Sequence, residues 1–128
     1  MVAVAAIEHA GQQEAAAKAY AALLRRWPDD LVAESGLANR EHAAGRVHSA
    51  ESRLCEAVRR YPDSVVVLNN LAQILSDEGR HEEALSLIDR ASALGGRFST
   101  TVAQTRDLIV ERMKANTHTS ASSNAVSH

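Results

Sequence analysis

The sequence predicts an all-α fold, an α-α superhelix of about three helix hairpins followed by a C-terminal capping helix. Two periodic patterns predict it. Single glycines and single alanines each recur with a step of 34 residues, at Gly11, Gly45 and Gly79 and at Ala16, Ala50 and Ala84. Trp27-Pro28-Asp29 returns at the same step as Tyr61-Pro62-Asp63. A fixed period of this length indicates that one helix pair is repeated and stacked on its neighbours.

The composition agrees with helices that pack closely. Among the 128 residues, one Trp, two Tyr and one Phe are the only aromatic residues, while alanine is abundant. Any core must therefore rely on close helix approach around small side chains. Fourteen basic and sixteen acidic residues give a formal net charge of −2 with both signs mixed along the chain. The sequence thus lacks the basic footprint of a nucleic-acid binder.

The first repeat, residues 1–28, is incomplete. Ten residues precede Gly11, so the first helix of this repeat lacks its N-terminal part. By analogy with Gly45 in the next repeat, we expect Gly11 to separate two helices. A truncated start of this kind favours a fragment of a longer polypeptide over a naturally short first repeat.

The second and third repeats carry the same local signals. Each has a helix-like stripe of apolar or small residues, a glycine suited to the left-handed conformation that commonly ends a helix, and a second amphipathic helix. Pro62 ends the second repeat because proline disfavours a helical residue before it, and Asp63 or Ser64 can cap the next helix. The boundaries are residues 29–62, with helices over 31–44 and 46–60, and residues 63–96, with helices over 65–78 and 80–93. Alanines at the crossings allow the paired helices to approach closely: Ala38, Ala50, Ala72 and Ala84.

The C-terminal region divides in two. Residues 98–115 place Val102, Leu108, Ile109 and Met113 between polar residues, which predicts the solvating cap helix that helical arrays need. The repeat domain therefore spans residues 1–115. Residues 116–128 are mostly Ser, Thr, Asn and His with little to bury, so this tail is predicted to be disordered.

These features resemble the tetratricopeptide repeat (TPR) family. Repeats of that family have Leu-Gly or Leu-Ala in the first helix, Ala and a large apolar residue in the second, and Pro at the end. The second repeat matches with Leu37-Ala38, Ala50, Leu54, Ala57 and Pro62, and the third with Leu71-Ala72, Ala84, Ile88 and Ala91. The departures are Glu34 and Leu68 for the usual Trp, Glu41 for the usual aromatic residue, and Gly95-Gly96 for the closing Pro.

The resemblance implies a non-catalytic protein-protein interaction module that binds a peptide segment or a partner domain in a concave groove lined by the first helices. Asn70 matches the position where TPR domains often have a peptide-holding Asn. An amide has both donors and acceptors, so it can bracket the backbone of an extended peptide. The alternative is that Asn69 and Asn70 only bond neighbouring helices. By alignment, the groove residues are Val32, Ser35, Asn39, His42, Val66, Asn69, Asn70, Gln73 and Ser76.

The predicted groove is neutral to acidic. None of its positions is basic, whereas Glu8, Asp77 and Asp107 lie nearby in the alignment. TPR domains that bind chaperone tails use Lys and Arg to hold the terminal carboxylate, so this kind of capture is not expected. Neutral or basic protein ligands are expected instead.

No residue pattern predicts catalysis, a cofactor or a metal site. The six histidines share no repeat position and form no HxxxH pair. Cys55 is the only cysteine, which excludes an internal disulfide, and it lies mid-helix without an adjacent base, so a small buried apolar role is expected. Arg25-Arg26 and Arg59-Arg60 fall in the last turns of helices, where cations complement the helix dipole.

Two other functions stay open from the sequence. Parts of residues 20–96 are similar to TPR segments that follow a papain-like C39-type cysteine peptidase domain in some bacterial proteins, which implies an accessory domain of an enzyme. The incomplete first repeat could instead leave an apolar edge for self-association into a homo-oligomer. No leader sequence and no membrane span is predicted, so the default expectation is cytoplasmic.

Overall fold

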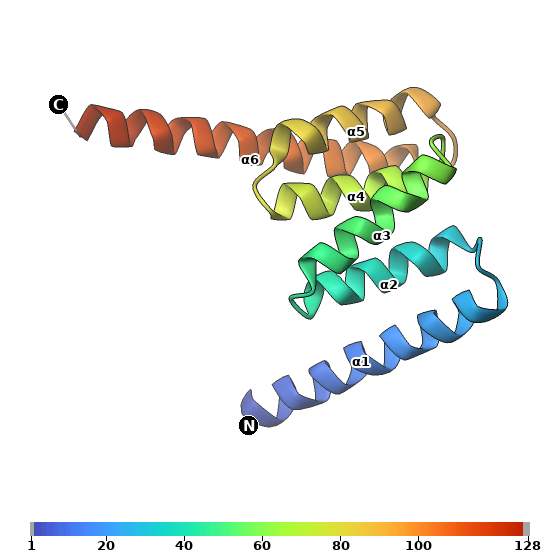
Figure 1. The fold of residues 1–128 in the computed structure, drawn as a ribbon. Coiled ribbons are helices and arrows are strands. Elements are labelled where there is room, and N and C mark those ends of the chain that lie inside the picture. The colour runs from blue at the N-terminus through green and yellow to red at the C-terminus, as the bar shows by residue number, and fades with distance from the viewer. Residues whose placement is uncertain (1, 127–128) are drawn as a thin grey trace.

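The structure, a computed structural model, describes the backbone of residues 2–126 and the side chains of residues 11–117. Within that range it contains six helices and no strand, which confirms the all-α prediction (Figure 1). The helices are α1 (Val2–Arg26), α2 (Leu31–Ala43), α3 (Val47–Arg60), α4 (Val65–Asp77), α5 (His81–Leu94) and α6 (Ser99–Val126). None of the described helices is long and apolar enough to cross a bilayer.

The helices form two layers. α2 packs on α4 and α4 packs on α6, whereas no Cα atoms of α1, α3 and α5 come within 8 Å of one another in the described part of the chain. α3 fits between α2 and α4, and α5 between α4 and α6. Because the layer of α2, α4 and α6 is the more closely spaced, the array curves around it, and this layer forms the inner, concave side. We call the surface of these three helices the concave face.

The two complete hairpins, α2–α3 and α4–α5, turn in the same way. Gly45 and Gly79 have φ of 85° and 82°, the left-handed region that disfavours residues with a Cβ. The amide after each glycine donates a hydrogen bond to a carbonyl of the preceding helix. Arg46 N–H donates to Glu41 O at 2.8 Å, and Arg80 N–H donates to Leu75 O at 2.9 Å. These bonds satisfy carbonyls that the helix end leaves unpaired.

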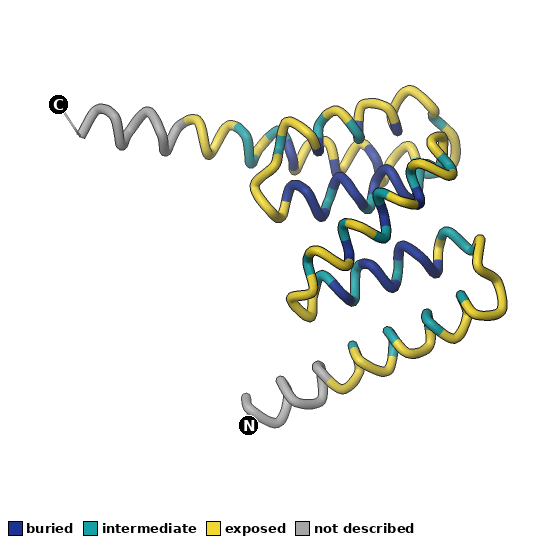
Figure 2. The backbone as a smooth tube through the Cα atoms, in the orientation of Figure 1, coloured by how far each residue is buried: buried dark blue, intermediate teal, exposed yellow. Residues whose placement is uncertain are grey.

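The core lies between the layers and is centred on α4 (Figure 2). The four alanines predicted at the helix crossings are fully buried, so the expected close approach is confirmed. Larger side chains fill the spaces beside them, and Leu54, Leu68 and Ile88 have no exposed surface. Ser64 caps α4 by accepting from Val67 N–H at 3.4 Å, as one of the two predicted capping residues.

α1 differs from the hairpin predicted for the first repeat. It is one helix of 25 residues that passes through Gly11, and Gly11 does not adopt the left-handed conformation. The prediction of a turn there is wrong, because the backbone of Gly11 stays helical and the helix continues on both sides of it. A glycine inside a helix costs only about 1 kcal/mol relative to alanine. The first hairpin is therefore reduced to one long helix.

α6 takes the place of the predicted capping helix and packs on α4 and α5. It is longer than predicted: its backbone stays helical to Val126, through most of the segment 116–128 that was predicted to be disordered. Residues 99–126 contain no Gly or Pro, and a helix satisfies its own backbone hydrogen bonds without a packing partner. Residues 127 and 128 lie outside the described part of the chain.

Candidate functional site

The concave face carries the residues that the sequence predicted for a peptide groove. α2 contributes Val32, Ser35, Asn39 and His42, and α4 contributes Val66, Asn69, Asn70, Gln73 and Ser76. The structure divides them by exposure. Val32 is 62% exposed, whereas Ser35, Asn69 and Ser76 are 3%, 8% and 3% exposed. The last three therefore belong to the helix packing, and only the remaining residues present accessible surface to a ligand.

Asn39 and Asn70 make the central contact across the concave face. Nδ2 of Asn39 donates to Oδ1 of Asn70 at 2.9 Å, which joins α2 to α4. Nδ2 of Asn70 donates to the carbonyl of Val66 at 2.7 Å, one turn earlier in the same helix. Asn70 therefore forms a hydrogen bond to a neighbouring helix, which is the alternative role that the sequence allowed for it. An amide offers two donor hydrogens and two acceptor positions, so half of its capacity remains for a ligand.

A second polar contact joins α4 to α6. Nε2 of Gln73 donates to Oγ1 of Thr105 at 3.4 Å, and the Thr105 hydroxyl donates to the carbonyl of Thr101 at 3.1 Å. The first of these is long for a hydrogen bond and correspondingly weak. Gln73 is therefore the amide on this face that is most easily redirected to another acceptor.

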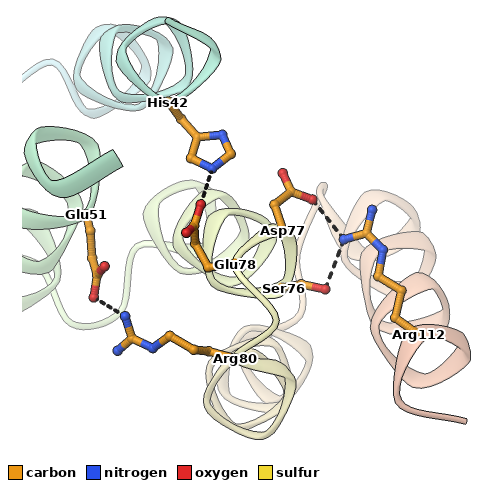
Figure 3. A network of polar contacts seen from close by, with 7 residues as sticks. All are labelled: His42, Glu51, Ser76, Asp77, Glu78, Arg80 and Arg112. Atoms are coloured by element: carbon orange, nitrogen blue, oxygen red, sulfur yellow. Dashed lines mark hydrogen bonds and ion pairs between the residues drawn. The ribbon is translucent and has the colours of Figure 1, made fainter. Parts of the chain in front are cut away.

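Polar contacts join the C-terminal end of α4 to both of its inner neighbours (Figure 3). Oε1 of Glu78 lies 3.0 Å from Nε2 of His42 on α2. On the other side, Nη1 of Arg112 on α6 donates to Asp77 Oδ1 at 2.8 Å and to Ser76 Oγ at 3.0 Å. Both carboxylates at this end of the groove are therefore already paired.

The turn that follows is held to the outer layer. Nη1 of Arg80 lies 2.5 Å from Glu51 Oε1 on α3, and Nη2 of Arg80 lies 2.7 Å from Glu83 Oε2 (Figure 3 shows the first pair). Hydrogen bonds to Glu83 and Glu51 raise the pKa of the Arg80 guanidinium, and the bond from Arg80 lowers the pKa of Glu83. These groups are exposed, so they add little to the free energy of unfolding but fix the position of the turn.

A pocket between α4 and α6 was not predicted. It has a volume of about 240 Å³, and its walls include Gln73, Thr105, Leu108 and Arg112. Leu108 is 43% exposed, while Ile109 below it is buried. From the sequence, α6 was expected only to cap the array. The 34-residue step that aligns α2 with α4 also aligns α4 with α6, but it pairs Thr105 and Leu108 with the buried Leu71 and Ile74, so it gave no signal for this pocket.

Catalytic and metal sites were not expected from the sequence. In residues 11–117, no group of three or more His, Cys, Asp or Glu is close enough to hold a metal ion. Cys55 is partly buried against the core, and burial, with a smaller contribution from Glu51, raises the pKa of its thiol. A raised pKa reduces the thiolate fraction, which is the reactive form.

Comparisons with known proteins agree with the fold. The family model described as tetratricopeptide repeat matches residues 41–97. Among solved structures, the chain is similar to the TPR2B domain in a complex with pHsp70, from yeast Sti1, with a TM-score of 0.67 and 19% sequence identity. That match covers 80% of this chain and 86% of the other. No curated protein matches the chain.

Proposed function

We propose that this chain, whose residues 41–97 are tetratricopeptide repeats, holds a peptide segment or a partner domain on the concave face of α2, α4 and α6. TPR domains are generally non-catalytic interaction modules, and the repeats here have that fold. The observation that carries the proposal is the row of side-chain amides at the centre of this face, Asn39, Asn70 and Gln73.

The amides suit a backbone ligand for a physical reason. Each peptide unit offers one N–H and one C=O, and a side-chain amide can pair with both. The contact from Asn39 to Asn70 fixes the orientation of both side chains before a ligand arrives. A pre-oriented group loses less side-chain entropy on binding, which favours affinity.

The similar yeast domain is in a complex with pHsp70, which supports a protein or peptide ligand for this chain. The ligand we propose for this chain is neutral or basic. Within residues 11–117, Arg112 is the only Lys or Arg that bonds Ser76 or Asp77 at the C-terminal end of α4. Its guanidinium is already paired with the Asp77 carboxylate. An acidic ligand would have to compete with that carboxylate for the guanidinium.

The test uses peptides selected from a random displayed library on the parent protein. We expect Asn70→Ala to weaken the binding of a selected peptide by about 1 to 3 kcal/mol, because a desolvated partner group is left without its hydrogen bond. Gln12→Ala, an exposed amide on α1, is the matched control and should leave the affinity unchanged. Fluorescence titration gives both dissociation constants.

Equal affinities for the parent and Asn70→Ala, with NMR chemical-shift changes confined to α3 and α5, would place the ligand on the outer layer and contradict the proposal. A circular dichroism spectrum of each variant separates a binding defect from a folding defect.

Self-association is a second candidate function, and one observation favours it. α1 packs only on α2 within the described chain, and Leu23 and Trp27 at its C-terminal end are 39% and 50% exposed. Exposed apolar groups of this kind can form a contact between copies. Light scattering over a concentration series tests it, with a constant monomer mass as the contradicting result. The accessory-domain alternative stays a prediction from the sequence.

A further inference from the structure

The turns between successive hairpins lie along one edge of the molecule (Figure 1). We call this surface the turn edge and define it as residues 25–30, 59–64 and 95–98 together with Arg90. Contacts show that the turns are neighbours. Nη1 of Arg60 lies 3.8 Å from Asp29 Oδ1 in the turn before it, and Nη2 of Arg90 donates to the carbonyl of Pro62 at 3.0 Å. The edge is therefore one continuous surface.

Each turn carries an arginine over an aromatic ring. The guanidinium carbon lies 4.8 Å from the ring centroid for Arg26 and Trp27, 5.8 Å for Arg60 and Tyr61, and 4.8 Å for Arg97 and Phe98. These rings are three of the four aromatic residues in the chain. A guanidinium stacked on a ring keeps its in-plane N–H donors free for a planar anion.

The positive charge of the turn edge is not neutralised internally. Within residues 11–117, four of its arginines have no carboxylate within ion-pair distance: Arg25, Arg26, Arg90 and Arg97. The edge has six arginines and three acids, and two of these acids are engaged, since Asp29 pairs with Arg60 and Asp30 caps α2, whereas Asp63 is exposed. A surface with an excess of guanidiniums over carboxylates attracts anions.

Helix stability does not account for the whole pattern. Arg25, Arg26, Arg59 and Arg60 lie in the last turns of α1 and α3, where they complement the helix dipole. Arg90 and Arg97 do not, because the last turn of α5 has no basic residue and Arg97 follows the helix end. The arginines follow the edge of the molecule and not the helix ends alone.

We propose that the turn edge binds an extended, acidic polypeptide segment. An extended chain presents side chains along its whole length, so its carboxylates can reach the exposed arginines of successive turns. The overall charge of −2 disfavours a long polyanion such as a nucleic acid, which would also face the acidic remainder of the chain.

The test uses a labelled peptide in which glutamate alternates with serine, with a peptide that has glutamine in place of every glutamate as comparison. Arg26→Gln, Arg90→Gln and Arg97→Gln together should weaken binding of the alternating peptide about tenfold, because three exposed ionic contacts are each worth several tenths of a kcal/mol. Lys18→Gln, Arg46→Gln and Lys114→Gln together change the net charge equally at other places and are the matched control. Fluorescence anisotropy measures both, and circular dichroism verifies that both variants fold.

Trp27 is the only tryptophan in the chain, so its emission reports on the turn edge in the unmodified protein. We expect the alternating peptide to change that emission with the same dissociation constant as the anisotropy, and added salt to weaken it. Three results would overturn the proposal: equal weakening in both triple variants, binding without a change at Trp27, or tighter binding of a short single-stranded RNA than of the peptide. Equal affinity for the glutamine peptide would also overturn it, because the carboxylates would then contribute nothing to binding.

Discussion

The two complete hairpins fill the same three positions with opposite chemistry. In α2–α3, Arg53 lies between two carboxylates, with Nε 2.6 Å from Glu41 Oε1 and Nη1 3.2 Å from Glu34 Oε1. One repeat later, in α4–α5, the equivalent positions hold three leucines that belong to or pack against the apolar core: Leu68, Leu75 and Leu87. Glu34 and Glu41 are 9% and 8% exposed, so the charged set is nearly as buried as the apolar one.

The same hairpin geometry forms whether these three positions hold apolar or charged side chains. Burial alone lowers the pKa of the Arg53 guanidinium, but hydrogen bonds and charges from Glu41 and Glu34 outweigh it, and the pKa is raised. The charged groups therefore satisfy one another inside the hairpin. The attraction between these three charged groups must still offset the free-energy cost of removing them from water, whereas leucine side chains have no such cost. Two members of the ion network, Glu34 and Glu41, stand where TPR repeats usually have aromatic residues, and Leu68 stands at one such position in the other hairpin.

Removal of the central cation should have the largest effect on this comparison. Arg53→Leu leaves Glu34 and Glu41 buried without a partner, so we expect the free energy of unfolding to fall by about 3 kcal/mol, toward the low end for buried pairs because Arg53 keeps some solvent contact. Urea unfolding measures it. The exposed Arg59→Leu is the control, and a loss no larger than that of the control would show that the network contributes nothing.

Replacement of all three charged residues should reverse the sign of the change in the free energy of unfolding. We expect Glu34→Leu, Glu41→Leu and Arg53→Leu together to leave the protein as stable as the parent or to stabilise it by about 1 to 4 kcal/mol, because the desolvation cost disappears and the leucines reproduce the second filling. The midpoint of urea unfolding gives the result. A triple variant less stable than Arg53→Leu alone would mean that the two hairpins differ in shape as well as in chemistry.

The helix crossings should respond alike in both hairpins. Ala50 and Ala84 are fully buried at equivalent positions, so Ala50→Leu and Ala84→Leu should each overpack a crossing and cost about 1 to 3 kcal/mol. Thermal unfolding of the two variants compares the hairpins directly. If only Ala84→Leu lowers the unfolding temperature, the crossing of the charged hairpin α2–α3 must be packed more loosely.

The smallest effects should come from the glycines, with opposite signs. Gly45→Ala and Gly79→Ala should each cost about 1 kcal/mol because an L residue is strained at those φ values. Gly11→Ala should stabilise α1 by about the same amount, since Gly11 lies inside a helix with open space around it. A destabilised Gly11→Ala variant would support the turn that the sequence predicted there.

The sequence assigned the candidate residues to the helices on which they lie, but it did not predict their contacts. The period put Asn39, Asn70 and Gln73 on the inner helices because it fixed which residues are equivalent. It gave no reason to expect Asn39 to bond Asn70 or Arg112 to pair with Asp77, since both contacts join separate helices. Ser35 and Asn69 were expected in the groove and are buried, because exposure depends on how closely the neighbouring helix approaches.

The sequence by itself determined the elements of this protein: where the turns at Gly45 and Gly79 fall, which alanines lie at the crossings, and that one helix pair is repeated. Those features follow from local chemistry, namely the left-handed freedom of glycine, the missing N–H of proline and the small volume of alanine. Only the tertiary structure decided that α1 continues through Gly11, that Glu34, Glu41 and Arg53 form one network, and that the arginine and aromatic pairs share an edge. The network and the shared edge depend on distances between residues far apart in the chain, and such distances are set by the packing of whole helices and not by any local pattern.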